Sequence, residues 1–201
     1  YTAASRAVLA HFDKYGIPVL LLDYDIVPSP ERSSYDLVGI DNVSAGLAIG
    51  RHLVRVGAKK ICFLQRPGTA PTVTDRLRGV ALAVLEAGLP WSHRHNVLRC
   101  EPEDRRRVSR FLTVERPDAL VSGNDVAAAT LKGTLEAVKK GAGVRLAGFD
   151  DVAVAAQLGL TTCRQPLDDL AHVAYQTLLQ RIKAPHLPPR TILLPAPLVV
   201  R

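Results

Sequence analysis

The stretch LAGFDDVAVAAQLGLTTCRQP, residues 146–166, begins as an apolar run and then places Asp150 and Asp151 directly after Phe149. An apolar run without polar alternation is typical of a strand that is buried on both faces of a parallel sheet. Such a strand carries the carboxylates that follow it to the end of the sheet. Because the ligand crevice of an open parallel sheet lies beyond the carboxyl ends of its strands, the stretch also predicts a polar site there.

Similar apolar runs alternate with helical patterns along most of the chain. The clearest helix is predicted over residues 75–88, where apolar residues recur every three or four positions. The other predicted helices cover residues 4–16, 43–57, 103–115, 125–140 and 167–182, and the predicted strands cover residues 17–23, 36–41, 60–65, 96–100, 119–124 and 144–150. Buried strands separated by amphipathic helices indicate a parallel sheet that is covered on both faces, and therefore an α/β fold.

The C-terminal stretch TILLPAPLVVR, residues 191–201, breaks this alternation. Pro195 and Pro197 have no backbone N–H to donate to a neighbouring strand. The stretch is therefore expected to form an edge strand or an extended tail.

The composition indicates a soluble globular chain. Its 201 residues are 47% hydrophobic and 22% charged, which is enough apolar material for one large domain or two smaller lobes. No apolar run has the length of a membrane-spanning helix, and the N-terminus lacks the pattern of a signal peptide. Cys62, Cys100 and Cys163 are widely spaced and form no CxxC pair, so we expect neither disulfides nor a metal site. These features predict a cytoplasmic protein without a cofactor, in which Cys62 and Cys163 are small core residues.

The net charge of +7 suits an anionic partner, but much of the excess lies in one predicted helix, EDRRRVSRFLTVE, residues 103–115. Val108, Phe111 and Leu112 share one face of that helix, which leaves four arginines mostly on the other. Two interpretations stay open: a solvated helix face and a phosphate-binding surface.

Polar residues gather where the predicted strands end. Asp23 ends one apolar run, Asn124 follows another, and Asp150 ends a third. Arg76 stands at the start of the clearest helix. Carboxylates, an amide and a guanidinium in one cleft can hold vicinal hydroxyls or the edge of a heterocycle through directional hydrogen bonds. The pattern therefore predicts a small polar ligand.

Several of these positions also have a purely structural interpretation. Asp125 and Asp75 stand where each could cap the helix that follows it. Asp150 and Asp151 could instead bind a metal, but no nearby His or Glu completes a ligand set. Motifs of common catalytic and nucleotide-binding sites are missing: there is no GxGxxG after a strand, no GxxxxGKS/T, no GxSxG and no HExxH. The chain is therefore not expected to be an enzyme.

Six segments carry a family resemblance through their order and spacing. They are GIPVLLLD (16–23), VGIDNVSAGLAIGRHLVRVGAKKICFL (38–64), DRLRGVALAVLEAGL (75–89), PDALVSGNDVAAATL (117–131), VRLAGFDDVAVA (144–155) and LTTCRQPLDDLAHVAYQTLL (160–179). Together they resemble the effector-binding domain of LacI/GalR-type transcriptional regulators. A single motif such as RLRG is weak, but the ordered series GIPV, DN, RLxG, SGND, GFDD and LTTxxQP is specific, and it spans nearly the whole chain.

The resemblance implies two doubly wound α/β lobes of the type I periplasmic-binding-protein kind, with an effector held between them. Residues 1–40 and 165–185 would form the N-terminal lobe, which is incomplete, and residues 41–164 and 186–201 would form the C-terminal lobe. The effector would be a sugar, a sugar phosphate or a purine-like metabolite. The positions that match the family's effector contacts are Asp23, Arg76, Asn124, Asp150 and Gln165.

The family's DNA-binding helix-turn-helix, its hinge helix and its first strand-helix unit have no counterpart in the sequence. The turn KKGAGVRLAGFDD, residues 139–151, is also shorter than is usual in the family, so residues of a longer protein are expected to be missing. The expected function is the effector-sensing core of a regulator that binds operator DNA through the missing domain. A homodimer is expected, partly through the helix that begins near Val126. The alternative is the solute-binding protein of a sugar transporter, which would carry an export signal and more aromatic residues in its cleft.

Overall fold

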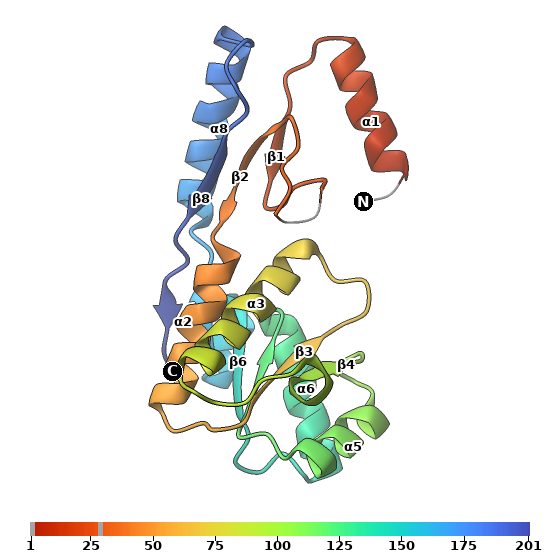
Figure 1. The fold of residues 1–201 in the computed structure, drawn as a ribbon, viewed down its shortest axis with the longest axis vertical. Helices are drawn as coiled ribbons and strands as arrows, with labels where there is room; N and C mark the ends of the chain where they lie inside the picture. The colour runs from red at the N-terminus through yellow and green to blue at the C-terminus, as the bar shows by residue number, and fades with distance from the viewer. Residues whose placement is uncertain (1–2, 28–29) are drawn as a thin grey trace. The chain divides into compact units, whose positions relative to one another are not determined.

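The computed structural model describes residues 3–27 and 30–201, and the chain divides into two compact units, most of whose elements are labelled in Figure 1. Unit 1 takes its described residues from Tyr1–Asp41 and Pro166–Pro195. Unit 2 consists of Asn42–Gln165 and Ala196–Arg201. The chain therefore passes between the units three times, and each unit contains its own sheet.

Unit 1 is built on a three-stranded sheet in the order β1 (Leu20–Leu22), β2 (Asp36–Ile40), β8 (Thr191–Leu194). Both strand pairs are parallel, and every residue of the middle strand β2 is buried. Helix α1 (Ala3–Lys14) precedes β1, and helix α8 (Leu167–Lys183) packs against β1 and β2.

The bounds of unit 1 differ from the expectation. Residues 186–195 were expected in the C-terminal lobe, but β8 pairs with β2 and therefore belongs to unit 1. Asp41 also belongs to unit 1, and Gln165 belongs to unit 2, each one residue across the expected boundary. The first strand covers only Leu20–Leu22 of the apolar run 17–23, because Ile17 is exposed and Pro18 has no N–H to donate to a ladder.

Unit 2 is built on a six-stranded sheet in the order β4 (Val97–Arg99), β3 (Ile61–Gln65), β5 (Ala119–Ser122), β6 (Arg145–Asp150), β7 (Thr161–Arg164), β9 (Leu198–Val199). All neighbours from β4 to β7 are parallel, and β9 is antiparallel to β7. These sheets confirm the predicted α/β class. The expectation for residues 191–201 is also confirmed, since β8 and β9 each lie at the edge of a sheet.

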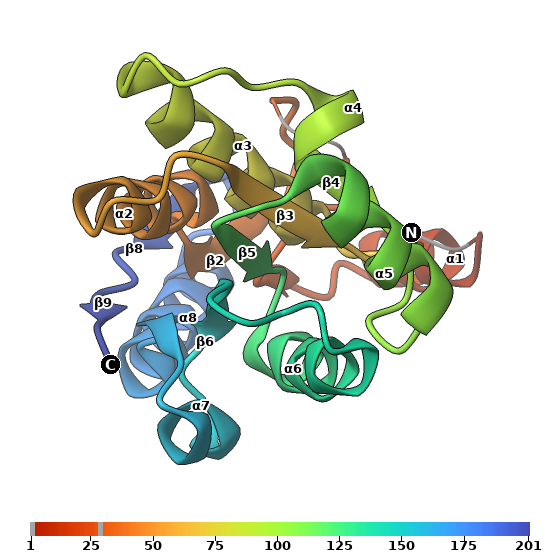
Figure 2. The same ribbon diagram turned by 90° about the horizontal axis from the view of Figure 1, so that it is seen from below.

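Helices cover both faces of the sheet in unit 2. Figure 2 shows α2 (Asn42–Arg55) and α3 (Pro71–Glu86) on one side of β3 and β5, and α6 (Asp125–Val138) on the other. The core under α2 and α3 includes Phe63 and Phe149, and the core under α6 and α5 (Arg105–Glu115) includes Leu64 and Leu120. Two short helices, α4 (His93–Asn96) and α7 (Ala153–Leu158), complete the described elements. None of the helices in the described residues combines the length and the apolar character that a membrane span requires.

Helices α2 and α3 cross at very short range because glycines stand at the crossing. A Cβ at Gly46 would lie 2.1 Å from the carbonyl oxygen of Arg76, and a Cβ at Gly79 would lie 2.1 Å from that of Val43. Either distance is impossible for a real side chain, so the crossing requires both glycines. This close packing fixes the position of Arg76, which lies on α3, relative to α2.

The start of α3 corrects a prediction from the sequence. The helix begins at Pro71, a residue that favours the first turn because it has no N–H to leave unpaired, and not near residue 75. Asp75 therefore does not cap the helix; its carboxylate accepts a hydrogen bond from Arg78 Nη1 at 2.6 Å. Arg76 accordingly lies in the second turn of α3 and not at its start.

Candidate functional site

A polar cluster lies in unit 2 at the carboxyl ends of β6 and β7. Asp150 is the last residue of β6, and Gln165 directly follows β7. The Oδ1 atom of Asp150 accepts a hydrogen bond from Gln165 Nε2 at 2.7 Å and another from Arg76 Nη1 at 3.1 Å. Three of the five residues predicted to contact the ligand are therefore joined around one carboxylate.

Several groups of unit 2 hold Arg76 in place. Its Nε donates to Asn42 Oδ1 at 2.8 Å, and its Nη1 donates to the carbonyl oxygen of Gly123 at 2.8 Å. The Cζ atom also lies 4.8 Å from the centre of the Phe149 ring, within the range of a cation–π contact. Only 5% of the Arg76 side chain is exposed, so this buried cation depends on Asp150 for its compensating charge.

The backbone at the end of β6 is strained. Asp150 and Asp151 have φ angles of 103° and 54°, in a region that residues other than glycine rarely adopt. Strain of this kind costs about 1–3 kcal/mol per residue and persists only where neighbouring contacts fix it. The carboxylate of Asp151 supplies such contacts, because it accepts hydrogen bonds from Arg164 Nε and Arg201 Nη2, each at 2.6 Å.

These contacts give the two neighbouring carboxylates different roles. Burial alone would raise the pKa of Asp151, but the hydrogen bonds from Arg201 and Arg164 hold it below its ordinary value. Asp151 is therefore an anion that fixes the turn. The side chain of Asp150 stays 25% exposed and can accept further hydrogen bonds.

Asp125 is fully buried and is coupled to the cluster through its charge. Its Oδ1 accepts a hydrogen bond from Thr162 Oγ1 at 2.8 Å, and its Oδ2 accepts one from the Val152 N–H at 3.1 Å. Burial raises the pKa of Asp125 to about 6 against the effect of these hydrogen bonds, and the charge of Asp150 adds to the rise. The predicted role of Asp125 as a helix cap is wrong, because its carboxylate joins α6 to β7 and to the start of α7.

Asn124 and Asp23, the other two residues predicted to contact the ligand, are positioned by other contacts. The Oδ1 atom of Asn124 accepts a hydrogen bond from the Ala127 N–H at 2.8 Å, so Asn124 is the cap of α6. Asp23 follows β1 in unit 1, with a φ of 75° and its N–H bonded to the Val38 carbonyl at 2.9 Å. Ligand contact at these two residues stays a prediction.

Sequence reasoning missed two of the groups that hold Arg76. One is Asn42, a polar residue between a strand and a helix, where a capping role is an equally good explanation. The other is the carbonyl of Gly123, and a backbone carbonyl has no signature in the residue type. The one available signal was the position of Asn42 directly after the strand-like run at 36–41.

The chemistry of the cluster suits recognition of a polar ligand. Asp150 offers a partly exposed acceptor, and Gln165 offers an amide beside it. A carboxylate of this kind accepts hydrogen bonds from ligand hydroxyls, and an amide both donates and accepts. Within residues 3–27 and 30–201, no group of three His, Cys, Asp or Glu side chains stands where it could hold a metal ion.

Comparisons with known proteins agree with this description of the fold. A family model described as a periplasmic binding protein-like domain matches residues 51–201. The HTH-type transcriptional repressor PurR of Photobacterium profundum is 25% identical over 177 residues, which cover 85% of this chain and 52% of that protein. The HTH-type transcriptional regulator DegA of Bacillus subtilis is 26% identical over 203 residues, which cover 98% of this chain and 59% of that protein. The chain therefore spans between half and three fifths of the length of these relatives.

A solved structure shows the same fold. It is a LacI family transcriptional regulator from Enterococcus faecium with bound ribose, and it superposes with a TM-score of 0.79 at 24% sequence identity. The superposition covers 98% of this chain and 73% of that one. The predicted periplasmic-binding-protein-like architecture is thereby confirmed.

Proposed function

Because the chain belongs to the periplasmic binding protein-like domain family, we propose that it is the effector-sensing part of a LacI-type transcriptional regulator. Its effector is a small polar metabolite, either a sugar or a nucleoside-like compound. The observation that carries this proposal is the cluster in which Arg76 and Gln165 both donate to the partly exposed carboxylate of Asp150.

The hydroxyl groups of a sugar match this cluster. Asp150 would accept hydrogen bonds from two vicinal hydroxyls, and Gln165 would donate to a ring or hydroxyl oxygen. The ribose bound to the Enterococcus faecium regulator supports a sugar of this size. Asp23 and Asn124 are proposed as further contacts on the strength of the family resemblance alone.

The regulatory step would take place in the whole protein. An effector that binds one of two conformational states more tightly shifts the population toward that state. We propose that this shift changes the affinity for operator DNA, which a helix-turn-helix in a further segment would read. The active form would be a homodimer in the cytoplasm, and α6, where Val126 is 62% exposed, is proposed as part of its interface on the strength of the family resemblance. No catalytic step is proposed.

The related proteins favour a regulator over a transporter component. PurR and DegA are both named as HTH-type transcriptional proteins. A solute-binding protein with the same fold would use more aromatic side chains to stack on a sugar. Around the Asp150 carboxylate the described contacts are a guanidinium and an amide.

A thermal-shift screen tests the proposal. Free pentoses, hexoses and nucleosides would be added singly to the purified chain, with amino acids as a contrasting class. A true effector at one hundred times its Kd stabilises the folded chain by about 2.7 kcal/mol, which is a clear rise in Tm. Stabilisation by a sugar or a nucleoside, lost in Asp150→Asn and kept in the exposed-acid control Glu103→Gln, is the expected result. A screen in which only amino acids stabilise the chain would contradict the proposal.

A further inference from the structure

Unit 2 contains a groove at one edge of its sheet, and none of the residues around the Asp150 carboxylate line it. The groove lies between β4 and α5, which Figure 2 shows next to each other, and it has a volume of about 330 Å³. β4 is the first strand in the sheet order, and among the described residues it pairs only with β3. The groove therefore runs beside a sheet edge that no other strand covers.

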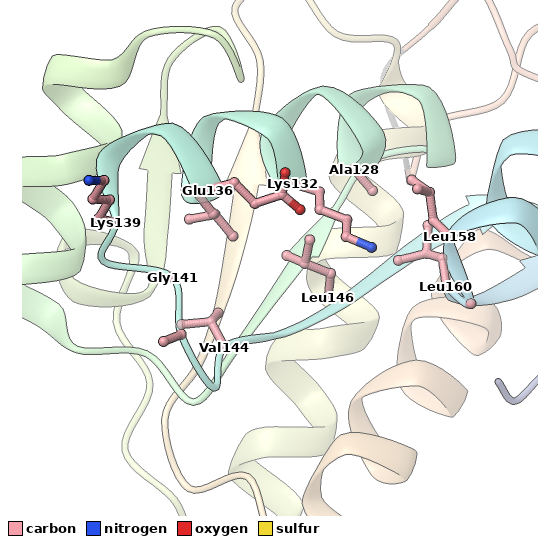
Figure 3. Close-up of a pocket in the computed structure, with 12 residues that line it drawn as sticks. Ala128, Lys132, Glu136, Lys139, Gly141, Val144, Leu146, Leu158 and Leu160 are labelled. Carbon is pink, nitrogen blue, oxygen red and sulfur yellow. The ribbon is translucent and has the colours of Figure 1, made fainter.

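The groove is separate from the face proposed for the homodimer. A cavity of about 590 Å³ opens beside α6 and the end of α7 (Figure 3), and a second chain that binds at α6 would cover it. No residue lines both that cavity and the groove. α5 contacts α6 through the core around Val108 and Leu112, neither of which lines the groove. A homodimer formed through α6 would therefore leave the groove free.

The floor of the groove is apolar. Leu98 of β4 is buried in the same core as Leu112, and Phe111 packs against that core while staying partly exposed. Val114, three residues after Phe111 on α5, also lines the groove and is 66% exposed. An apolar surface thus continues from the core out to solvent, and a partner that covers it removes this surface from water.

Three arginines line the groove beside this floor. Arg107, Arg110 and Val114 follow one another at spacings of three and four residues, so they share one side of α5. Arg99 comes from β4, and its carbonyl oxygen accepts a hydrogen bond from Arg107 Nη1 at 3.3 Å. Guanidinium groups from a helix and from the edge strand are therefore brought to one groove.

The positive charge of the groove is not neutralised within the chain. Among the described residues neither Arg99 nor Arg110 takes part in an ion pair. Glu115 also lines the groove, but it pairs with Lys60 at 3.2 Å and only 12% of its side chain is exposed. A helix face that serves only solubility is typically laced with charges of both signs, so the unpaired arginines favour an interaction surface.

The exposure of the groove indicates which class of partner it suits. Small-molecule sites bury about 70–90% of their ligand. Here the side chain of Arg107 is 64% exposed and Val114 is 66% exposed, so a small molecule would stay largely in solvent. A nucleic acid would bind the arginines through its phosphates and leave the apolar floor uncovered. A protein segment can cover the floor and the arginines together.

From these observations we propose that the groove between β4 and α5 binds an acidic segment of another protein. An apolar side chain of the segment rests on Leu98, Phe111 and Val114, and flanking carboxylates pair with Arg99 and Arg110. A guanidinium group binds a carboxylate through two parallel hydrogen bonds, and arginine and aromatic residues supply much of the binding energy of protein interfaces. The net charge of +7 speeds the encounter with an acidic partner. The groove does not depend on the effector site.

Peptide selection tests the proposal without assuming a partner sequence. A phage-displayed library of random peptides is selected on the purified 201-residue chain, and the most enriched peptide is synthesised with a fluorescein label. We expect enriched peptides to carry aspartates and glutamates on both sides of a large apolar residue. Fluorescence anisotropy should show saturable binding of the labelled peptide, and this binding should weaken at high salt because exposed charges are screened.

Matched arginine variants locate the bound peptide. Arg110→Gln should weaken binding about tenfold. Arg106→Gln should bind like the unaltered chain, because Arg106 is an exposed arginine of the same helix that does not line the groove. The two arginines are four residues apart, so either substitution removes the same like-charge pair and the comparison is matched for helix stability. Val114→Ser should also weaken binding, and circular dichroism checks that each variant keeps the fold.

Several results would overturn the proposal. One is the selection of basic or purely apolar peptides, and another is a peptide whose binding does not saturate. Equal binding by Arg106→Gln and Arg110→Gln would show that the attraction is diffuse, and unchanged binding by Val114→Ser would show that the floor is not covered. A labelled DNA duplex that binds more tightly than the peptide, and less tightly to Arg110→Gln, would assign the groove to nucleic acid instead.

Discussion

Arg76 and Asp150 are separated by 74 residues in the sequence, yet Nη1 of the arginine lies 3.1 Å from Oδ1 of the aspartate. The arginine is almost fully buried, while a quarter of the aspartate side chain is exposed. The arginine end of the pair is therefore held in the protein interior, while the aspartate end is partly open to solvent. This asymmetry lets Asp150 serve a ligand while Arg76 supplies its counter-charge and orients it.

The helix crossing that presents Arg76 should be intolerant of side chains. In Gly46→Ala the new methyl group would meet the backbone of Arg76, and relieving that contact should lower the free energy of unfolding by about 1–3 kcal/mol. Gly133→Ala in α6 is the matched control, since nothing lies within 4 Å of its Cβ position. That control should raise the free energy of unfolding by about 0.5–1 kcal/mol. Urea denaturation measures both, and equal effects of the two substitutions would refute the packing argument.

Asp125 should make the stability of unit 2 depend on pH in an unusual direction. Its pKa is raised from 3.8 to about 6 in the folded chain, so between these values the native state binds more protons than the unfolded state. The stabilisation is fully present below about pH 4 and is lost as the pH rises through about 6, with a total change of roughly 1–3 kcal/mol. The unfolding free energy of the unaltered chain minus that of Asp125→Asn isolates this effect. A difference that stays constant from about pH 4 to about pH 7 would contradict it.

Asp36 should show the opposite dependence in unit 1. It is fully buried, and its carboxylate accepts hydrogen bonds from Arg181 Nε at 2.9 Å and from the Arg190 N–H at 2.8 Å. Burial alone would raise the pKa of Asp36, but these partners lower it, so its contribution is present above about pH 4 and is lost as the pH falls. Asp36→Asn leaves two partly buried arginines without a partner charge and weakens the hydrogen bonds they make, so it should cost about 1–3 kcal/mol at about pH 7. Urea denaturation measures this cost. The control Glu31→Gln, a substitution at an exposed position, should show no comparable loss of unfolding free energy.

The three cysteines should be chemically silent in the folded chain. Burial raises the pKa of Cys62 and Cys163 to about 12 and that of Cys100 to about 11, so almost no thiolate exists at about pH 8. A thiol-specific chromogenic reagent should therefore label none of them within minutes in buffer and all three in denaturing urea. Rapid labelling of the folded chain would show that the two cores around these residues open readily.

The sequence was informative where a single periodic signal decided the structure. Apolar runs without alternation correctly predicted β2, β3, β5 and β6, because strands that are covered on both faces lack the regular polar alternation of a strand with one face in solvent. The same signal predicted that Asp150 lies at a strand end, and the strained turn after Phe149 places it there. The contact between Asp150 and Arg76 could not be predicted in this way, because it depends on how α3 crosses α2, and no local sequence pattern specifies that crossing.

Prediction failed where two local signals competed. The capping signal of Asp75 decided the predicted helix start, but the helix begins at Pro71 because the fixed φ of proline suits the first turn. Asn124 and Asp125 are adjacent capping residues, and only burial against β7 decides that the first caps α6 while the second bonds to Thr162. The sheet to which β8 belongs is decided by its long-range pairing with β2. The neighbouring prolines indicate an edge strand, but they do not indicate which strand it pairs with.

The central claim is that the carboxylate of Asp150, held by Arg76 and Gln165, binds a small polar effector. Calorimetric titration of the best stabilising sugar or nucleoside into the unaltered chain, Asp150→Asn and Gln165→Leu measures it most directly, with Glu103→Gln as the control. We expect one ligand per chain, at least about tenfold weaker binding in Asp150→Asn, a smaller loss in Gln165→Leu, and unchanged affinity in the control. Equal affinity in all four proteins would contradict the assignment of the site.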